Sequence, residues 1–298
     1  MNIFIIIDKN SPAANNIKDK LLHEQKIFSE TGLVFKNHKV HQYRNAYLVT
    51  SPTRSVDSEK IDEDIESILS IKPDIIIFPT THRSKSRIPS LMVHTQGNWG
   101  EAELGGLNRK ICISAENFIK YALQYIVNNK HKYKDIRDFD VAQEVTHHGP
   151  IVSCPSMFIE IGSSEKEWDI DDGGRIIADT LVWLIDCTEE IINSDYITAF
   201  GIGGTHTCSN FLKIMLNDPD IAIGHVCPKY ALENLDQEMI KQGMERSMKR
   251  ADFIILDWKG MGEHKERILD ILEEMNIPYK KTKEYKYEAQ TNETNNDN

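Results

Sequence analysis

Short apolar runs alternate with amphipathic segments along the chain. Ile3–Ile7 and Ile75–Phe78 contain almost no polar residues, which is typical of strands that are buried on both faces. Between them, Ile61, Ile65 and Leu69 recur at helical spacing among acidic residues, and this pattern predicts a helix with one exposed face. The first two hundred residues and the last hundred follow the same alternation.

The whole pattern predicts an α/β protein. Further strands are expected at Tyr47–Thr50, Leu91–Val93, Ile111–Ser114, Val141–Thr146, Met157–Ile161, Ala199–Ile202, Ile221–Val226 and Phe253–Asp257, and further helices at Ser11–Lys26, Ala115–Asn129, Gly173–Cys187 and Ile268–Met275. Such alternation favours a three-layer α/β/α sandwich with a mixed, largely parallel sheet. No linker interrupts residues 1–280, so we expect a single domain there. Residues 281–298 are polar and are predicted to form a disordered tail.

Composition and charge limit the partners and the cellular compartment that can be expected for the protein. The 35 Lys and Arg against 46 Asp and Glu give a net charge of -11, which disfavours indiscriminate attraction to nucleic acid but allows a local basic patch. The five cysteines form no CxxC pair, as expected of a reducing cytosol. The apolar run at the N-terminus is too short to span a membrane. We therefore expect a soluble cytoplasmic protein without a membrane partner.

The stretch with the most chemical content is QEVTHHGPIVSCPSMFIEIGSS, residues 143–164. His147 and His148 stand in a Gly-Pro loop between two predicted strands, and Glu160 interrupts the apolar second strand. A carboxylate inside an apolar strand is costly unless it is paired or bound to a metal. The alternative is a polar turn beside a hydrogen-bonded buried glutamate, and this stretch alone does not separate the two.

Histidines recur at the ends of the predicted strands. Six of them follow or close an apolar run: His82, His94, His147, His148, His206 and His225. In an α/β sheet the loops beyond the carboxyl ends of the strands form the ligand crevice, so these side chains are candidates for a metal site or an acid/base site. The alternative is that some of them only bind backbone groups in loops. No short zinc signature such as HExxH is present.

Two other segments have residues suited to a nucleic acid. The loop at residues 81–87 carries Arg83, Lys85 and Arg87 together with several hydroxyl groups, which suit phosphate contacts; a solvated surface loop is the alternative. Trp99, next to Asn98 and flanked by glycines, could stack on a base or belong to the core.

Several collinear blocks resemble a known family. THRSKSRIPSLMVHTQGNWGEAELGG, EVTHHGP, FIEIGSSEKEW, GIGGTH and GHVCPKYAL are similar to segments of the archaeal and plant type of D-aminoacyl-tRNA deacylase, in the same order. The likeness extends from the first strand to about Tyr279.

The resemblance implies hydrolysis of the ester between a D-amino acid and tRNA by a zinc-dependent monomer with a phosphorylase/hydrolase-like fold. It makes Zn²⁺ the expected cofactor and tRNA the expected partner. The candidate catalytic residues are His147, His148 and His206. The candidate zinc ligands are His94, His147, Glu160, His206 and His225, and the candidate substrate-binding residues are His82, Arg83, Lys85, Arg87, Asn98 and Trp99. A metallopeptidase or amidohydrolase of the same fold class, or a tRNA-binding module without catalysis, remains the alternative.

Overall fold

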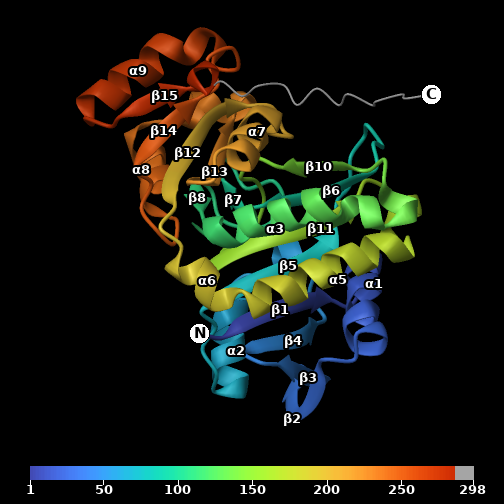
Figure 1. The fold of residues 1–298 in the computed structure, drawn as a ribbon. Coiled ribbons are helices and arrows are strands. Elements are labelled where there is room, and N and C mark those ends of the chain that lie inside the picture. The colour runs from blue at the N-terminus through green and yellow to red at the C-terminus, as the bar shows by residue number, and fades with distance from the viewer. Residues whose placement is uncertain (286–298) are drawn as a thin grey trace, which may run out of the picture.

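A computed structural model describes residues 1–285 of the chain. Its strands divide between a large sheet and a small one, with the C-terminal small sheet above the N-terminal large sheet in Figure 1. The large sheet has the order β10-β6-β11-β5-β1-β4-β3-β2, with β9 also pairing with β11. The small sheet has the order β13-β12-β14-β15, and β7 and β8 form a separate ribbon. The mixed, largely parallel α/β architecture that the sequence predicts is confirmed, although its strands form two main sheets.

The bounds of the strands are as follows. The large sheet contains β1 (Ile3–Asp8), β2 (Ser29–Phe35), β3 (His38–Tyr43), β4 (Ala46–Ser51), β5 (Ile75–Thr81), β6 (Ser90–His94), β9 (Ile113–Ser114), β10 (Asp140–Gln143) and β11 (Pro155–Gly162). The small sheet contains β12 (Ile197–Gly204), β13 (Ile221–Pro228), β14 (Phe253–Leu256) and β15 (Tyr279–Lys281), while the ribbon is formed by β7 (Gly97–Asn98) and β8 (Lys110–Ile111).

The α-helices cover both faces of the large sheet and surround the small one. They are α1 (Pro12–Asp19), α2 (Ile61–Leu69), α3 (Glu116–Asn129), α4 (Glu165–Trp168), α5 (Asp171–Asp186), α6 (Thr188–Asn193), α7 (Ser209–Asn217), α8 (Gln237–Glu245) and α9 (Lys265–Glu274).

Alternation along β1 explains the layers. Ile3, Ile5 and Ile7 pack with residues of α1, α3 and α5, whereas Phe4 and Ile6 pack on the opposite face with residues of α2. This is the two-residue period of a strand that is buried on both faces. The cluster around Ile3 also contains buried residues of β12, β13 and β14, so the apolar interior is continuous between the two sheets.

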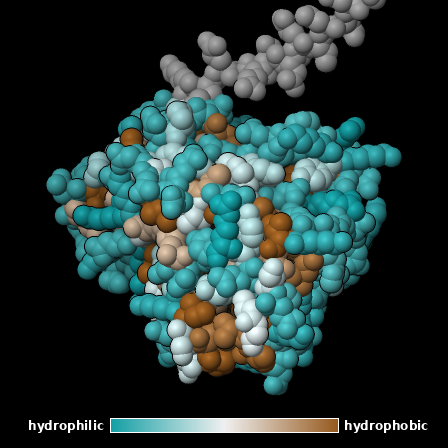
Figure 2. Space-filling view, turned by 60° about the horizontal axis from the view of Figure 1, so that its bottom comes forward, coloured by the Kyte–Doolittle hydropathy of each residue, from teal (hydrophilic) through white to brown (hydrophobic). Residues whose placement is uncertain are grey.

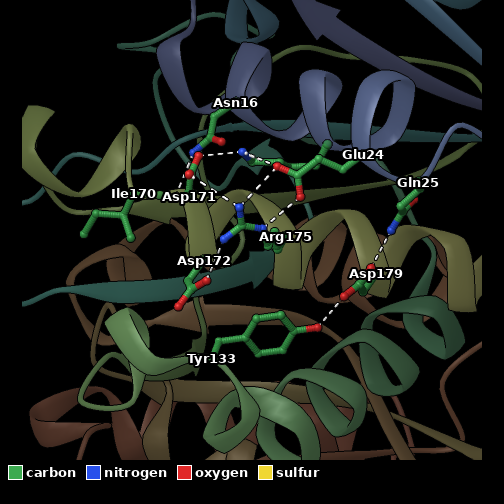
Figure 3. A network of polar contacts seen from close by, with 10 residues as sticks. Asn16, Glu24, Gln25, Tyr133, Ile170, Asp171, Asp172, Arg175 and Asp179 are labelled. Carbon is green, nitrogen blue, oxygen red and sulfur yellow. Dashed lines mark hydrogen bonds and ion pairs between the residues drawn. The ribbon is translucent and has the colours of Figure 1, made fainter.

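A polar network fastens the helices on one face of the large sheet (Figure 3). Lys20, in a π-helical turn at Lys20–Glu24, lies 2.5 Å from Asp171 of α5, and Arg175 lies 2.8 Å from Glu24. The Asn16 amide of α1 donates to the carbonyls of Trp168 and Ile170. The network thus holds α1 against the α4–α5 segment that follows β11.

The C-terminal end of the described chain differs from the predicted boundary between domain and tail. Lys281 belongs to β15, where it pairs with Leu256, and a 3₁₀ turn follows at Thr282–Glu284; the ordered chain therefore passes the predicted boundary at residue 280. The rest of the predicted tail, residues 286–298, lies outside the described residues.

Among the helices of residues 1–285, none combines the length and the apolar character needed to cross a bilayer. The face in Figure 2 is mostly hydrophilic, with one larger hydrophobic group at its lower end.

A buried lysine joins the two sheets. Lys120 of α3 has no exposed surface, and its ammonium donates to the carbonyls of Met215, Asp218 and Ile221 at 3.3, 2.8 and 2.6 Å. These carbonyls belong to α7, to the residue that follows it and to the start of β13, in the small-sheet half of the molecule. Three carbonyls satisfy the three protons of the ammonium.

We predict that Lys120→Met lowers the free energy of unfolding by at least about 2 kcal/mol, because it leaves buried carbonyls without a donor. Thermal or urea unfolding measures this change. Lys213→Met, at an exposed position of α7, is the matched control and should change stability very little. Equal effects of the two substitutions would contradict the role given to Lys120.

Candidate functional site

Five of the six strand-end histidines lie in one cluster between the sheets. His94 ends β6, His147 and His148 lie in the loop after β10, and His206 follows β12. The ring of His147 lies 4.3 Å from that of His94, 4.4 Å from that of His148 and 4.7 Å from that of His206, between centroids. His82, just beyond β5, joins the cluster through two carboxylates.

Those carboxylates are Glu160 of β11 and Glu144, which follows β10. His82 Nδ1 lies 3.4 Å from an oxygen of each. Glu144 Oε1 also lies 3.0 Å from His206 Nε2, and Glu160 Oε1 lies 3.7 Å from His94 Nε2. The side chain of Glu144 is fully buried. The sequence reading missed this residue, although a carboxylate inside the predicted strand Val141–Thr146 was the same signal that drew attention to Glu160.

Backbone contacts fix the position of His82. Its N–H donates to the Ile161 carbonyl of β11, and its own carbonyl accepts from the indole of Trp168 at 3.0 Å. Because Asn16 binds the carbonyl of Trp168, the helix network of Figure 3 extends to the edge of the histidine cluster.

The carboxylates divide the histidines into two electrostatic types. Burial would lower the pKa of His82, but Glu144 and Glu160 raise that pKa to about 10. Burial likewise opposes a charge on His94, yet Glu160 raises the pKa of His94 above its usual value. Burial would raise the pKa of Glu144, but His206 and His82 hold it well below its usual range. Without a metal, the core of the cluster is therefore ionic.

The rings of His147 and His148 are of the neutral type. Burial lowers the pKa of His147 well below its usual value, and the nearby His94 and His148 lower it further. Burial together with His94 also lowers the pKa of His148, to about 4. Neutral imidazoles are the form that accepts a proton or binds a metal.

Hydrogen bonds to backbone carbonyls orient three of the rings. Nδ1 of His94, His147 and His148 lies 3.2, 2.9 and 2.6 Å from the carbonyls of Thr95, Val145 and Gly149. A carbonyl can only accept, so Nδ1 carries the hydrogen in each ring and Nε2 is left as the second ring nitrogen facing the cluster. Binding of the other ring nitrogen to a carbonyl is the usual arrangement in metal-ligating histidines.

The cluster fits a transition-metal ion. Its possible ligand atoms form three overlapping groups, within each of which they lie no more than 4.8 Å apart: His94, His147 and His148; Glu144, His147 and His206; His82, Glu144 and Glu160. His94 Nε2 and both oxygens of Glu144 are buried yet have no aligned hydrogen-bond partner in the described chain. Imidazole and carboxylate ligands are those of catalytic zinc sites, so the donor set suits Zn²⁺.

His225 does not lie in any of these groups. Its Nδ1 lies 3.0 Å from Thr146 Oγ1 and its Nε2 lies 2.6 Å from the Arg246 carbonyl. It lies inside β13, which continues to Pro228, rather than at the end of the strand where the sequence reading placed it. Both ring nitrogens are therefore occupied, and the structure gives His225 the position of a buried, hydrogen-bonded histidine.

The candidate substrate-binding residues are more widely spread. Trp99 is buried, stacks on Phe200 and donates its indole N–H to the Thr146 carbonyl, so it supports the histidine loop from the core. The amide of Asn98 binds the carbonyls of Gly105 and Leu107 and shapes the adjacent glycine-rich loop.

The basic loop lies at the surface. Arg83 forms a 2.6 Å ion pair with Glu165 and lies over the ring of Trp168. Lys85 and Arg87 are exposed. Arg83 is thus held beside His82, while the other two side chains are open to solvent.

Two hollows open on either side of His147 and His148. The first hollow, of about 590 Å³, also contains Trp99, Leu104 and Tyr230. The second, of about 430 Å³, contains His82, Glu160, His206 and the guanidinium-bearing Arg54 and Arg83. Since the two histidines line both hollows, a ligand lying across them would pass over the imidazoles.

Tyr230 is a residue that the sequence reading did not single out. Its hydroxyl lies 3.3 Å from His206 Nδ1, and its side chain is exposed in the first hollow. The two nitrogens of His206 thus have different neighbours: Nε2 lies beside Glu144, and Nδ1 lies beside the Tyr230 hydroxyl in the first hollow.

The structure is that of an α/β protein whose cleft contains neutral imidazoles, buried carboxylates and a set of donor atoms that suits a metal ion. These groups can activate a water molecule, so the site is that of a hydrolase. Residues 69–280 match the model of the D-aminoacyl-tRNA deacylase family, and the chain belongs to this family. It is 37% identical to the D-aminoacyl-tRNA deacylase of Pyrococcus abyssi and 36% identical to that of Thermococcus kodakarensis, in each case over 92% of this chain and 98% of the relative. A crystal structure of a conserved protein of unknown function superposes with a TM-score of 0.81 at 28% identity, covering 95% of this chain and 96% of that one.

We predict that His225→Ala lowers stability by roughly 1–3 kcal/mol, because Thr146 and Arg246 lose a buried partner. The affinity for added Zn²⁺, measured in competition with a chelator, should equal that of the wild type. A variant that keeps its melting temperature but binds Zn²⁺ more weakly would show that His225 is a ligand.

Proposed function

We propose that this protein hydrolyses the ester bond of D-aminoacyl-tRNA and releases the free D-amino acid and tRNA. The observation that carries the proposal is the pair of neutral imidazoles, His147 and His148, at the place where the two hollows meet. Membership of the deacylase family supports the choice of substrate. The cytoplasmic location expected from the sequence suits an enzyme that corrects mischarged tRNA.

The chemistry needs a base, a positioned carbonyl and a proton for the leaving group. His147 Nδ1 is held by the Val145 carbonyl, so its Nε2 can take a proton from the water that attacks the ester carbon. The resulting imidazolium can return the proton to the ribose oxygen as the C–O bond breaks. His82, positively charged at neutral pH, keeps Glu144 and Glu160 ionised beside the reacting groups.

We further propose Zn²⁺ as the cofactor. Glu144, His147 and His206 would hold it, and the Nε2 of His148, whose Nδ1 is held by the Gly149 carbonyl, would then be the base in place of His147. When bound, zinc lowers the pKa of water to about 7 and polarises a carbonyl oxygen. Glu160 reaches His94 and His82 in the structure, so it supports this site either as a ligand or through these histidines.

The second hollow contains residues that could bind the tRNA part of the substrate. Arg54 and Arg83 line it, and Lys85 and Arg87 are exposed on the adjoining loop. We propose that this side takes the terminal nucleotide of the tRNA, because guanidinium and ammonium groups suit phosphate.

The test of the proposed activity is deacylation of D-tyrosyl-tRNA beside L-tyrosyl-tRNA. The wild type should hydrolyse the D-ester faster, and His147→Ala should lower its rate at least about 10²-fold, the usual scale for loss of an acid/base group. His131→Ala, at an exposed position, is the control and should keep the rate. Cleavage of peptides without deacylation, or tRNA binding without turnover, would contradict the proposal.

The test of the cofactor uses Glu160→Gln, which removes a charge at nearly constant volume. Zinc content and activity should fall together, and added zinc should restore part of the activity because mass action offsets a weaker site. Glu116→Gln is a matched buried control outside the cluster and should retain its zinc. A Glu160→Gln protein with full zinc and full activity would remove Glu160 from the site.

A further inference from the structure

The small sheet presents one continuous edge next to the site. Its four strands are all parallel, so their carboxyl ends lie on the same side, where α/β sheets bind ligands. His206 follows β12 and Tyr230 follows β13 at this edge. The histidine cluster is therefore one end of a longer surface.

Lysines follow the other strand ends along this surface. Lys229 follows β13, Lys259 comes three residues after the end of β14, and Lys281 ends β15; Lys265 begins α9, and Lys283 lies in the turn after β15. We call these five residues the basic edge. In the described chain none of them forms an ion pair with a carboxylate, whereas lysines on other elements do: Lys20, Lys36, Lys39, Lys60 and Lys249.

An aromatic ring holds two of these lysines in place. The ammonium of Lys281 lies 3.8 Å from the ring centroid of Trp258, and that of Lys265 lies 5.3 Å from it. Such cation–π contacts fix the side chains without neutralising their charge. Both ammonium groups therefore keep their charge and can bind a phosphate.

The basic edge is joined rigidly to the cleft. Arg267 of α9 donates to the carbonyls of Leu232 and Leu235, which belong to the turn Lys229–Asn234 and the residue that follows it. The same turn carries Tyr230, whose hydroxyl contacts His206. The distance between the basic edge and the reacting groups is thereby fixed.

We propose that the basic edge binds the phosphate backbone of the tRNA acceptor stem while the aminoacyl end lies in the cleft. This inference rests on the proposed function. The ester is carried at the end of an A-form duplex, which proteins recognise by its shape and its phosphates. The net charge of -11 requires that binding come from local cations rather than from the overall field.

Glutamates next to the basic edge affect how it would bind the tRNA phosphates. Glu263 and Glu266 lie on the same segment as Lys265 and are exposed, so they offset part of the charge of the basic edge. Binding therefore depends on individual lysine–phosphate contacts at fixed positions, and exchange of a few lysines should remove most of it.

The experiment compares Lys259→Gln/Lys265→Gln/Lys281→Gln with a control variant, Lys26→Gln/Lys72→Gln/Lys241→Gln. Both triple variants change the net charge equally, and the control lysines are exposed on other elements. Each protein is assayed on D-tyrosyl-tRNA and on D-tyrosyl-adenosine, which has the same ester but no duplex. Melting temperatures verify that the variants are folded.

The basic-edge variant should lose about tenfold or more in kcat/KM on the tRNA ester, mainly through KM. Its salt slope should become shallower by about one unit for each phosphate that the variant no longer neutralises. Its activity on the adenosine ester should equal that of the wild type. The control variant should match the wild type on both substrates. Equal decreases on both esters, or identical behaviour of the two triple variants, would overturn the proposal.

A binding measurement keeps this inference separate from the proposed function. If the wild type hydrolyses neither ester, the proposed function fails, and fluorescence anisotropy with uncharged tRNA then tests the basic edge directly. Weaker binding by the basic-edge variant alone supports the edge. Binding that is unchanged from the wild type rejects it.

Discussion

The site depends on two carboxylates that are buried beside a protonated histidine. Glu144 and Glu160 could not remain ionised in the interior alone, because removing a charge from water is costly. His82 lies 3.4 Å from both of them and its pKa is raised to about 10. This arrangement keeps negative charge inside the cluster, where it can hold imidazolium or a metal cation.

The position of the charges follows from the two sheets. β5, β6, β10 and β11 of the large sheet carry or precede His82, His94, Glu144 and Glu160, and β12 of the small sheet delivers His206. The contact between Glu144 and His206 therefore crosses from one sheet to the other. Lys120 secures the same junction from α3, so the geometry of the cluster depends on how the two sheets pack.

The electrostatics of the surface also differ from those of the whole chain. An acidic protein that acts on a polyanion has to place its cations locally. Here the lysines at the ends of β13, β14 and β15 have no carboxylate partners in the described chain, and Arg54 and Arg83 line the second hollow. These cations lie at strand ends and in the second hollow, where the proposed function requires a polyanion to bind.

Most of the secondary structure and most of the candidate site residues follow from the order of residues along the chain. Apolar runs and helical spacing located most of the strands and the helices α1, α2, α3, α5 and α9, because burial on both faces or on one stripe leaves a periodic pattern. The helices α7 and α8 were not predicted. The hairpin of β2 and β3 was missed, since Ser29–Phe35 and His38–Tyr43 are partly exposed and polar. The family blocks also identified the relatives, because a long collinear match is specific.

Which side chains contact one another depends on how distant strands pack. His225 and His206 look alike in sequence, yet β13 extends three residues beyond His225, whose ring nitrogens bind the Thr146 hydroxyl and the Arg246 carbonyl. His206 lies beyond the end of β12. Glu144 carries the same sequence signal as Glu160, but its partners His82 and His206 are distant in the chain and are shown only by the structure. Periodicity records whether a side chain is buried, but the partner that makes a buried charge tolerable is set by the packing of separate strands.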